Sequence, residues 1–429
     1  MEEKKIGFWS STSLVVGNMI GSGVFMLPAS LAAYGSISLV GWFFSSIGAV
    51  LLALVFGYLS QLAPDSIGGP YAYIRLGLGD FPAFLVAWGY WISVWCVNAA
   101  IAVALVGYLG IFFPILHQSK ILAVVTGLGV IWFFTWINSK PLKTVAIVQL
   151  ITTILKVMPI VLIGFIGIFY LNIDNFFPIN ISGKSDFSAI TTATTLTLFA
   201  FLGMESASIT GSNIEDAGTT IKKATMLGTL ITILIYVMST IAIMGIIPPK
   251  ILAFSNAPFT EAAGLFWGDS ASYIVGGGAV IATLGALNGW ILIQGQIPLA
   301  AAQDKLFPKI FGKVNKNNSP IIGIVISSVL ASGLMYLNYA KSLIQAFTFM
   351  IQLSTLSVLL PYLLSTVSLW ILIRRKEGVI SLNKKLLSIF TFAFCIWVIV
   401  GCGIKIISWG VILLVVGIPF YVHLKKIKL

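Results

Sequence analysis

The chain has 429 residues, of which 58% are hydrophobic and only 9% are charged, and its formal net charge is +12 at pH 7. Soluble domains contain about 25% charged residues, so this composition excludes a soluble globular protein. Its apolar runs reach the length of ~20 residues that crosses a bilayer as a helix. We therefore predict an all-α polytopic membrane protein, with one transmembrane domain over residues 1–429.

Twelve apolar segments are predicted to span the membrane. In chain order they are residues 8–33, 36–61, 81–112, 121–138, 146–170, 188–212, 224–247, 272–300, 320–339, 343–370, 386–404 and 407–424. With the loops assigned alternately to the two sides, nineteen of the 25 Lys and Arg residues fall on the side of the N-terminus and five on the other. Cytoplasmic loops carry this excess of positive charge. Both termini are therefore predicted to be cytoplasmic. Because this asymmetry accounts for the positive charge, no nucleic-acid partner is predicted.

The first span contains a glycine-rich interruption, GNMIGSG at 17–23. Glycine lets the backbone leave helical geometry, and the N–H groups freed at the start of a half-helix suit a carboxylate. The alternative is close helix packing, because Gly17 and Gly21 form a small-xxx-small pattern. A second interruption in span six favours the binding interpretation, since paired breaks in two halves of a hydrophobic chain are typical of transporter sites.

Lys156 lies inside span five, within the apolar run LITTILKVMPIVLIG at 150–164. A lysine at mid-span can supply the positive charge of a bound sodium ion, or carry a coupled proton. The alternative is a lysine that reaches the cytoplasmic interface from a span that begins later.

Glu205 lies in the apolar run LTLFAFLGMESASI of span six, two residues after Gly203. A carboxyl group inside a membrane segment is costly and marks an ion or proton path. Loss of water disfavours the ionised form, so Glu205 is a candidate proton site or pH-sensitive gate. The alternative is a structural carboxyl group hydrogen-bonded to a neighbouring helix.

Several other function classes lack their sequence signatures. Cys96, Cys395 and Cys402 lie in apolar spans without metal or disulfide spacing, so no metal or cofactor is predicted. The chain has no P-loop and too few intramembrane charges for a catalytic cluster, so we predict no enzyme. A channel would show rings of repeated polar residues, and a sensor would carry a soluble output domain. Neither feature is visible in the sequence, so neither class is predicted.

Six motifs together resemble the amino acid–polyamine–organocation (APC) transporters, above all the basic amino acid/polyamine antiporters of the arginine/agmatine and ornithine/putrescine type. They are GNMIGSGVFMLP (17–28), GGPYAY (68–73), TLFAFLGMESAS (197–208), APF (257–259), LFPKIF (306–311) and PYL (361–363). The resemblance covers essentially the whole chain.

The resemblance implies a leucine-transporter-like fold with two inverted five-helix repeats, at 8–170 and 188–370, whose helices 1 and 6 are unwound. Residues 386–424 would form two extra helices. It implies a secondary active transporter of the cell inner membrane that works by alternating access. Such a protein exchanges a basic amino acid for a related amine or amino acid. A homodimer is implied as well.

The resemblance also carries functional residues to this chain. The substrate-binding residues it implies are Met19, Gly21, Ser22, Gly23, Ser93, Val94, Asn98, Phe199, Leu202, Trp290 and Ser354. It implies a gate on the cytoplasmic side formed by Tyr90, Glu205 and Tyr362, and the proton-coupling candidates are Glu205 and Lys156.

Two residues depart from the arginine/agmatine pattern. Phe199 stands where those exchangers have tryptophan, and phenylalanine offers a weaker cation–π face, so arginine specificity stays open. Lys156 resembles instead the span-five lysine of proton-coupled amino acid transporters in the same superfamily. Proton/amino acid symport through Lys156 is therefore the alternative function.

Overall fold

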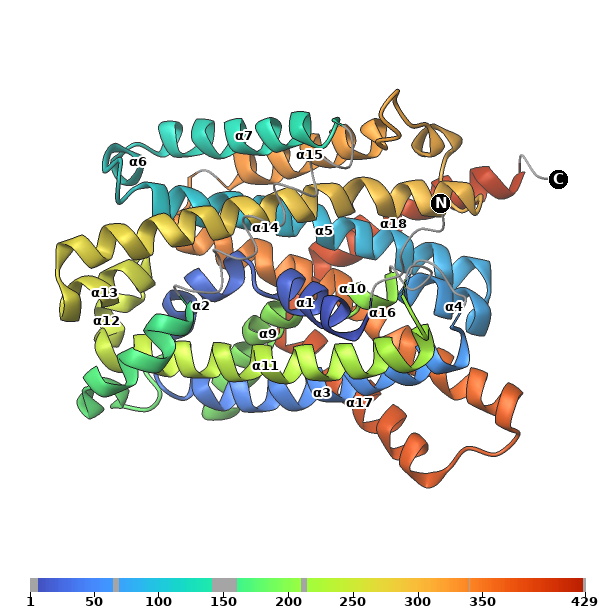
Figure 1. Ribbon diagram of the computed structural model, residues 1–429, viewed down its shortest axis with the longest axis horizontal. Helices are drawn as coiled ribbons and strands as arrows, with labels where there is room; N and C mark the ends of the chain where they lie inside the picture. The colour runs from blue at the N-terminus through green and yellow to red at the C-terminus, as the bar shows by residue number, and fades with distance from the viewer. Residues whose placement is uncertain (1–6, 65–68, 141–159, 210–213, 339, 427–429) are drawn as a thin grey trace.

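The computed structural model describes residues 7–64, 69–140, 160–209, 214–338 and 340–426. The regular elements of these ranges are helices (Figure 1). Within the described residues, nine helices are long and apolar enough to cross a membrane. They are α3 (Ser38–Leu62), α5 (Asp80–Leu109), α7 (Lys120–Ile137), α9 (Asp186–Leu198) with its continuation, α11 (Ala217–Ile246), α14 (Asp269–Gln303), α16 (Leu343–Glu377), α17 (Leu382–Gly401) and α18 (Gly403–Lys426). The chain is thus a polytopic membrane protein, as its composition predicted.

The other three predicted spans are found only in part. Span one is a bent pair, α1 (Phe8–Met19) and α2 (Ser22–Ala32), with an angle of 42° between its halves. Of span five, residues 141–159 lie outside the described residues, and Ile160–Tyr170 forms a short apolar helix. Span nine is α15 (Ile321–Leu337), which has 17 residues. The number of twelve spans therefore stays a prediction.

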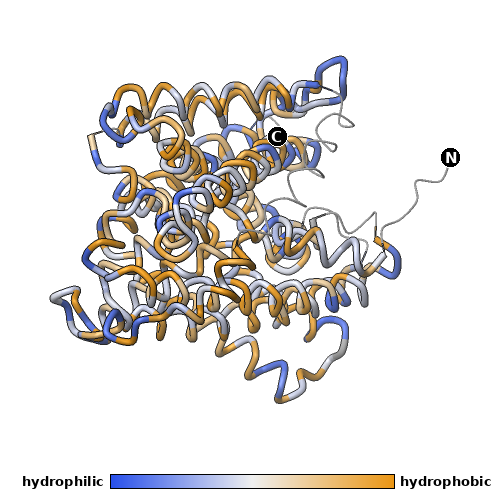
Figure 2. Tube along the Cα trace, turned by 60° about the vertical axis from the view of Figure 1, so that its left-hand side comes forward, coloured by the Kyte–Doolittle hydropathy of each residue, from blue (hydrophilic) through white to orange (hydrophobic). Residues whose placement is uncertain are grey.

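Helix α5 lies at the centre of the bundle. It packs against α16, α14, α15 and α7, and 94% of its most apolar stretch is buried. A helix that is apolar on all sides is expected to be surrounded by others. The last two helices are the opposite case, because only 33% of the corresponding stretch of α17 and 17% of that of α18 are buried. Figure 2 shows the apolar residues along the long helices and the hydrophilic ones at the turns.

Two short helices precede the long ones at opposite ends of the bundle (Figure 1). Helix α4 (Pro70–Leu78) leads into α5 through Gly79, whose φ is +90°. Helix α13 (Pro258–Trp267) leads into α14 through Gly268, whose φ is +81°. Glycine adopts these left-handed angles without a steric penalty, so each short helix can end abruptly and turn into the next span. The remaining short elements are α6 (Ile115–Gln118), α12 (Pro249–Leu252), η1 (Gly167–Tyr170), η2 (Ile173–Phe176) and η5 (Lys309–Gly312).

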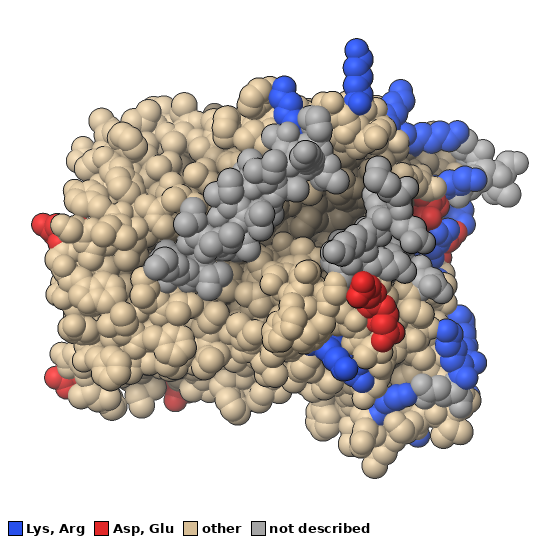
Figure 3. Space-filling view, in the orientation of Figure 1, with Lys and Arg blue, Asp and Glu red and all other residues tan. Residues whose placement is uncertain are grey.

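Charged side chains gather at the ends of the bundle. On the face shown in Figure 3, Lys and Arg side chains lie over the right-hand half with a few Asp and Glu among them, and the left-hand end carries only Asp and Glu. Arg75 pairs with Asp80 and with Asp304, both at 3.1 Å, and Lys425 pairs with Asp80 at 3.4 Å. These ion pairs connect α4, α5, the end of α14 and α18. Because the partners are about 36–49% exposed, solvent screens these pairs and each contributes little to the stability of the fold.

Candidate functional site

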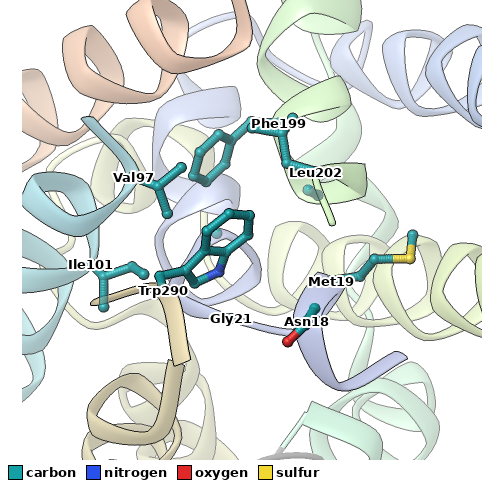
Figure 4. Close-up of a pocket in the computed structure, with 10 residues that line it drawn as sticks. Asn18, Met19, Gly21, Val97, Ile101, Phe199, Leu202 and Trp290 are labelled. Atoms are coloured by element: carbon teal, nitrogen blue, oxygen red, sulfur yellow. The ribbon is translucent and has the colours of Figure 1, made fainter. Parts of the chain in front are cut away.

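A cavity of about 280 Å³, including the open space at its mouth, lies where the bent first span meets the middle of α5 and α14 and the turn that follows α9 (Figure 4). It is lined by Asn18, Met19, Gly21, Gly23, Val97, Ile101, Phe199, Ala200, Leu202 and Trp290. Six of the predicted substrate-binding residues are therefore brought together: Met19, Gly21, Gly23, Phe199, Leu202 and Trp290.

The helix of the first span is interrupted beside this cavity. Ile20 is extended (φ −74°, ψ 95°), and so is Gly21 (φ −131°, ψ −152°), after which α2 begins. The Tyr236 hydroxyl of α11 donates a hydrogen bond of 2.6 Å to the Met19 carbonyl at the end of α1. The first N–H groups of α2 have no partner within their own helix, and the helix dipole makes this end positive. The interruption is therefore a favourable binding site for an anion such as a carboxylate.

A second interruption faces the first. After α9 the chain forms a 3₁₀ turn, η3 (Phe199–Phe201), and regular helix resumes only at α10 (Ser206–Ile209). Gly203 lies between them with a φ of +98°. A Cβ atom on Gly203 would lie 3.2 Å from the backbone of Asn18. The absence of a side chain at Gly203 therefore lets the two interruptions pack directly against each other.

The carboxyl group of Glu205 joins three spans. Glu205 is fully buried, and its Oε1 accepts a hydrogen bond of 2.5 Å from the Tyr90 hydroxyl of α5. Its Oε2 accepts another of 2.9 Å from the Tyr362 hydroxyl of α16. Both tyrosines are buried, so the carboxyl group of Glu205 connects the second interruption to α5 and α16 through two buried hydrogen bonds.

This Tyr90–Glu205–Tyr362 cluster lies to one side of the cavity. Tyr90 precedes Val97 of the cavity wall by seven residues of α5, which is about 10 Å along a helix. The displacement is toward Asp80, the residue that pairs with Arg75 and Lys425. The cluster is thus placed on the side of the cavity that faces the end rich in Lys and Arg.

Four predicted substrate residues do not line this cavity. Ser93, Val94, Asn98 and Ser354 are all buried. The hydroxyls of Ser93 and Ser354 hydrogen-bond to each other at 2.8 Å, and the Asn98 amide donates to Gln294 Oε1 at 2.7 Å. These polar side chains pair with neighbouring spans in this conformation, and their contact with substrate stays a prediction.

Two predictions fall on residues that are not described. The side chain of Ser22 and the whole of Lys156 lie outside the described residues. Within the described ranges, no three His, Cys, Asp or Glu side chains come close enough to hold a metal ion.

Four residues of the cavity wall were not predicted: Asn18, Val97, Ile101 and Ala200. Asn18 and Ala200 fall within the motifs 17–28 and 197–208, so the motifs contained the signal. Val97 and Ile101 follow Val94 at spacings of three and seven, which places them on one face of a helix.

Comparison with known proteins identifies relatives that match over most of the chain. The family model described as amino acid permease matches residues 6–420. The chain is 32% identical over 429 residues to a cadaverine/lysine antiporter of Escherichia coli (strain K12), covering 97% of this chain and 94% of that protein. It is 28% identical to an arginine/ornithine antiporter of Pseudomonas aeruginosa, with coverages of 98% and 91%. It is 29% identical to an arginine/agmatine antiporter of Chlamydia pneumoniae, with coverages of 99% and 91%.

These names indicate transporters rather than enzymes, and they confirm the resemblance that the sequence motifs carried. Both the family match and the relatives extend over most of the chain. The chain therefore belongs to the amino acid permease family of the amino acid–polyamine–organocation superfamily, among relatives that are basic amino acid/polyamine antiporters.

Proposed function

We propose that this protein is a secondary active antiporter that exchanges a basic amino acid for a related amine or amino acid by alternating access. The observation that carries the proposal is the cavity at two facing helix interruptions, with the buried Tyr90–Glu205–Tyr362 cluster on one side of it. The relatives' names, which pair lysine with cadaverine and arginine with ornithine or agmatine, support the substrate class.

The lining of the cavity suits an amino acid, because the start of α2 and the rings of Phe199 and Trp290 meet there. The substrate carboxylate would bind the N–H groups at the start of α2. Phe199 and Trp290 would then cover the rest of the molecule, and their ring faces attract an ammonium group.

The contacts between helices support two repeats, residues 8–170 and 188–370, with twelve spans in all. If span one corresponds to span six, span two to span seven and so on, each contact between two spans should recur between the two corresponding spans. The contact of α1 with α11 is matched by that of α9 with α3, and α5 with α7 by α14 with α15. The contact of α7 with α14 is matched by that of α15 with α5.

The short helices α4 and α13 support the inverted relation of the repeats. Each begins with proline and ends at a left-handed glycine followed by aspartate, at Gly79-Asp80 and Gly268-Asp269. They precede the third span of their repeats, and they lie at opposite ends of the bundle (Figure 1). Helices 1 and 6 would then be the unwound pair of a leucine-transporter-like fold, with residues 386–424 outside the repeats.

The end rich in Lys and Arg would face the cytoplasm, because cytoplasmic loops carry positive charge. Both termini would be cytoplasmic and the membrane the cell inner membrane. The Tyr90–Glu205–Tyr362 cluster would then be the cytoplasmic-side gate, with Glu205 as its proton-sensitive group. The homodimer implied by the family stays a prediction.

Counterflow in proteoliposomes tests the proposal. Labelled lysine, ornithine and arginine are offered to vesicles that contain unlabelled lysine, ornithine, arginine, cadaverine or agmatine, or none of them. We expect saturable uptake that requires an internal basic amino acid or amine. Uptake into empty vesicles driven by a pH gradient would contradict exchange and favour proton symport through Lys156.

Replacement of Phe199 by tryptophan is expected to increase the preference for arginine. Phe199 lines the cavity, and tryptophan has the stronger cation–π face, with such contacts worth ~0.5–2 kcal/mol. The change should lower the concentration of arginine that half-inhibits lysine exchange by about threefold or more. Competition by leucine, which has no cationic side chain, serves as the control. An equal change for arginine and leucine would show that the ring does not recognise charge.

A further inference from the structure

A chain of hydrogen bonds between buried side chains crosses four spans next to the cavity. Asn98 Nδ2 of α5 donates to Gln294 Oε1 of α14 at 2.7 Å. Gln294 Nε2 donates to Ser328 Oγ of α15 at 2.8 Å, and Ser328 pairs with Thr135 of α7 at 2.6 Å. Asn98, Gln294 and Ser328 are fully buried and Thr135 is 4% exposed. Such groups must satisfy one another, because water does not reach them.

A backbone carbonyl fixes the direction of these hydrogen bonds. Gln294 Nε2 also donates to the Ile324 carbonyl oxygen at 3.1 Å, and a carbonyl oxygen can only accept. The nitrogen of the Gln294 amide must therefore face α15, and its oxygen must face α5. Only the amide nitrogen of Asn98 can donate a hydrogen bond to the amide oxygen of Gln294. Gln294 therefore sets the orientation of the Asn98 amide.

This arrangement leaves an acceptor unused. Asn98 Oδ1 is buried and has no hydrogen-bond partner among the residues that the structure describes. Asn98 follows Val97 directly and precedes Ile101 by three residues, and both of these line the cavity. Gln294 lies one helical turn after Trp290, which also lines it. The Asn98–Gln294 pair therefore belongs to the layer of side chains next to the cavity wall.

We propose that Gln294 is a positioning residue that keeps the carbonyl oxygen of Asn98 free to accept a hydrogen bond from the terminal ammonium of the substrate. The inference rests on the proposed function. In Figure 4, Val97 and Ile101 of α5 lie on the other side of the cavity from Asn18 and Met19 of the first interruption. A substrate whose carboxylate binds at that interruption extends its side chain toward α5.

The consequence is selectivity for a primary amine. A terminal ammonium gives the buried oxygen a charge-assisted hydrogen bond. A neutral side chain of the same length leaves that oxygen unpaired, and buried sites reject analogues that lack the matching group. Without Gln294, the Asn98 amide can turn and present its nitrogen, which repels an ammonium group.

The experiment compares matched substrates in proteoliposomes. Lysine is paired with norleucine and ornithine with norvaline, which differ only in the terminal ammonium, and apparent KM values for exchange are measured. In Gln294→Met we expect the preference for the basic member to fall about tenfold, as loss of one hydrogen bond to a charged group predicts. The KM for the basic substrate should rise while the maximal rate changes little.

Two further variants make the result specific. Ser328→Ala removes one partner of Gln294 but leaves the Ile324 carbonyl in place, so the preference should stay within about twofold of the wild type. Gln294→Glu keeps an acceptor for Asn98 and should keep the preference, and it serves as the test if the methionine variant does not assemble. Loss of the preference in Gln294→Glu would overturn the inference.

The outcomes separate the two proposals. An unchanged KM ratio in Gln294→Met, or an equal loss for both members of a pair, overturns the role of Gln294 while wild-type exchange stands. Absence of exchange by the wild-type protein with every amino acid would instead overturn the proposed function.

Discussion

Glu205→Gln is expected to remove the pH dependence of exchange. As a carboxylate, Glu205 accepts hydrogen bonds from both Tyr90 and Tyr362, and hydrogen bonds to charged groups are roughly twice as strong as neutral ones. In the proposed gate, protonation of Glu205 would weaken these two hydrogen bonds, so the rate of exchange should rise as the pH falls. Glutamine cannot ionise, so the variant should show at neutral pH the rate that the wild type reaches in acid, an increase of about tenfold. Initial rates of lysine exchange across a pH series measure this.

Tyr362→Phe is the matched control for this prediction. It removes one hydrogen bond of 2.9 Å to Glu205 but leaves the ionisable group in place. Its exchange should still depend on pH, with a smaller amplitude than in the wild type. A wild-type pH profile in Glu205→Gln would show that another group carries the proton and would remove Glu205 from the gate.

Gly203→Ala is expected to have the largest effect on both stability and transport. The backbone of Gly203 has a φ of +98°, and left-handed geometry costs an L-residue about 1–2 kcal/mol. The new Cβ atom would also lie 3.2 Å from the backbone of Asn18, which lines the cavity. The two interruptions would have to separate, so the unfolding temperature in detergent should fall by several degrees and exchange by about tenfold or more.

Gly333→Ala provides the comparison. Gly333 lies inside α15, where a Cβ atom would meet open space. Alanine favours helix over glycine by about 1 kcal/mol, so this variant should be as stable as the wild type or more so, with unchanged exchange. Equal behaviour of the two alanine variants would mean that the close approach at Gly203 has no functional importance.

The long spans could be predicted from sequence because a bilayer leaves the backbone few choices other than helix. The span predicted at 36–61 is observed as Ser38–Leu62, and that at 81–112 as Asp80–Leu109. The short helices α4 and α13 were not predicted. Their hydrophobic runs are too brief to indicate a span, and the proline and glycine at their ends are turn signals as well.

The candidate site could be predicted only where a local feature of the chain creates it. Gly203 marks an interruption whose φ of +98° favours glycine, and Gly21 lies in the other interruption with extended backbone; both lie beside the cavity. Asn98 was predicted to face substrate, but its orientation depends on Gln294, which is 196 residues away in sequence. Such pairings arise from packing between distant helices and cannot be predicted from the periodicity of one span.

Side-specific labelling of the cavity tests most directly whether the Tyr90–Glu205–Tyr362 cluster closes its cytoplasmic side. Cysteine is introduced at Val97, which lines the cavity, and the native cysteines Cys96, Cys395 and Cys402 are buried. A membrane-impermeant thiol reagent is then applied from either side of oriented vesicles. We predict slow modification from the cytoplasmic side, protection by lysine or ornithine, and faster cytoplasmic modification when Glu205→Gln is added. Equal modification from both sides, unaffected by substrate or by Glu205→Gln, would contradict the account.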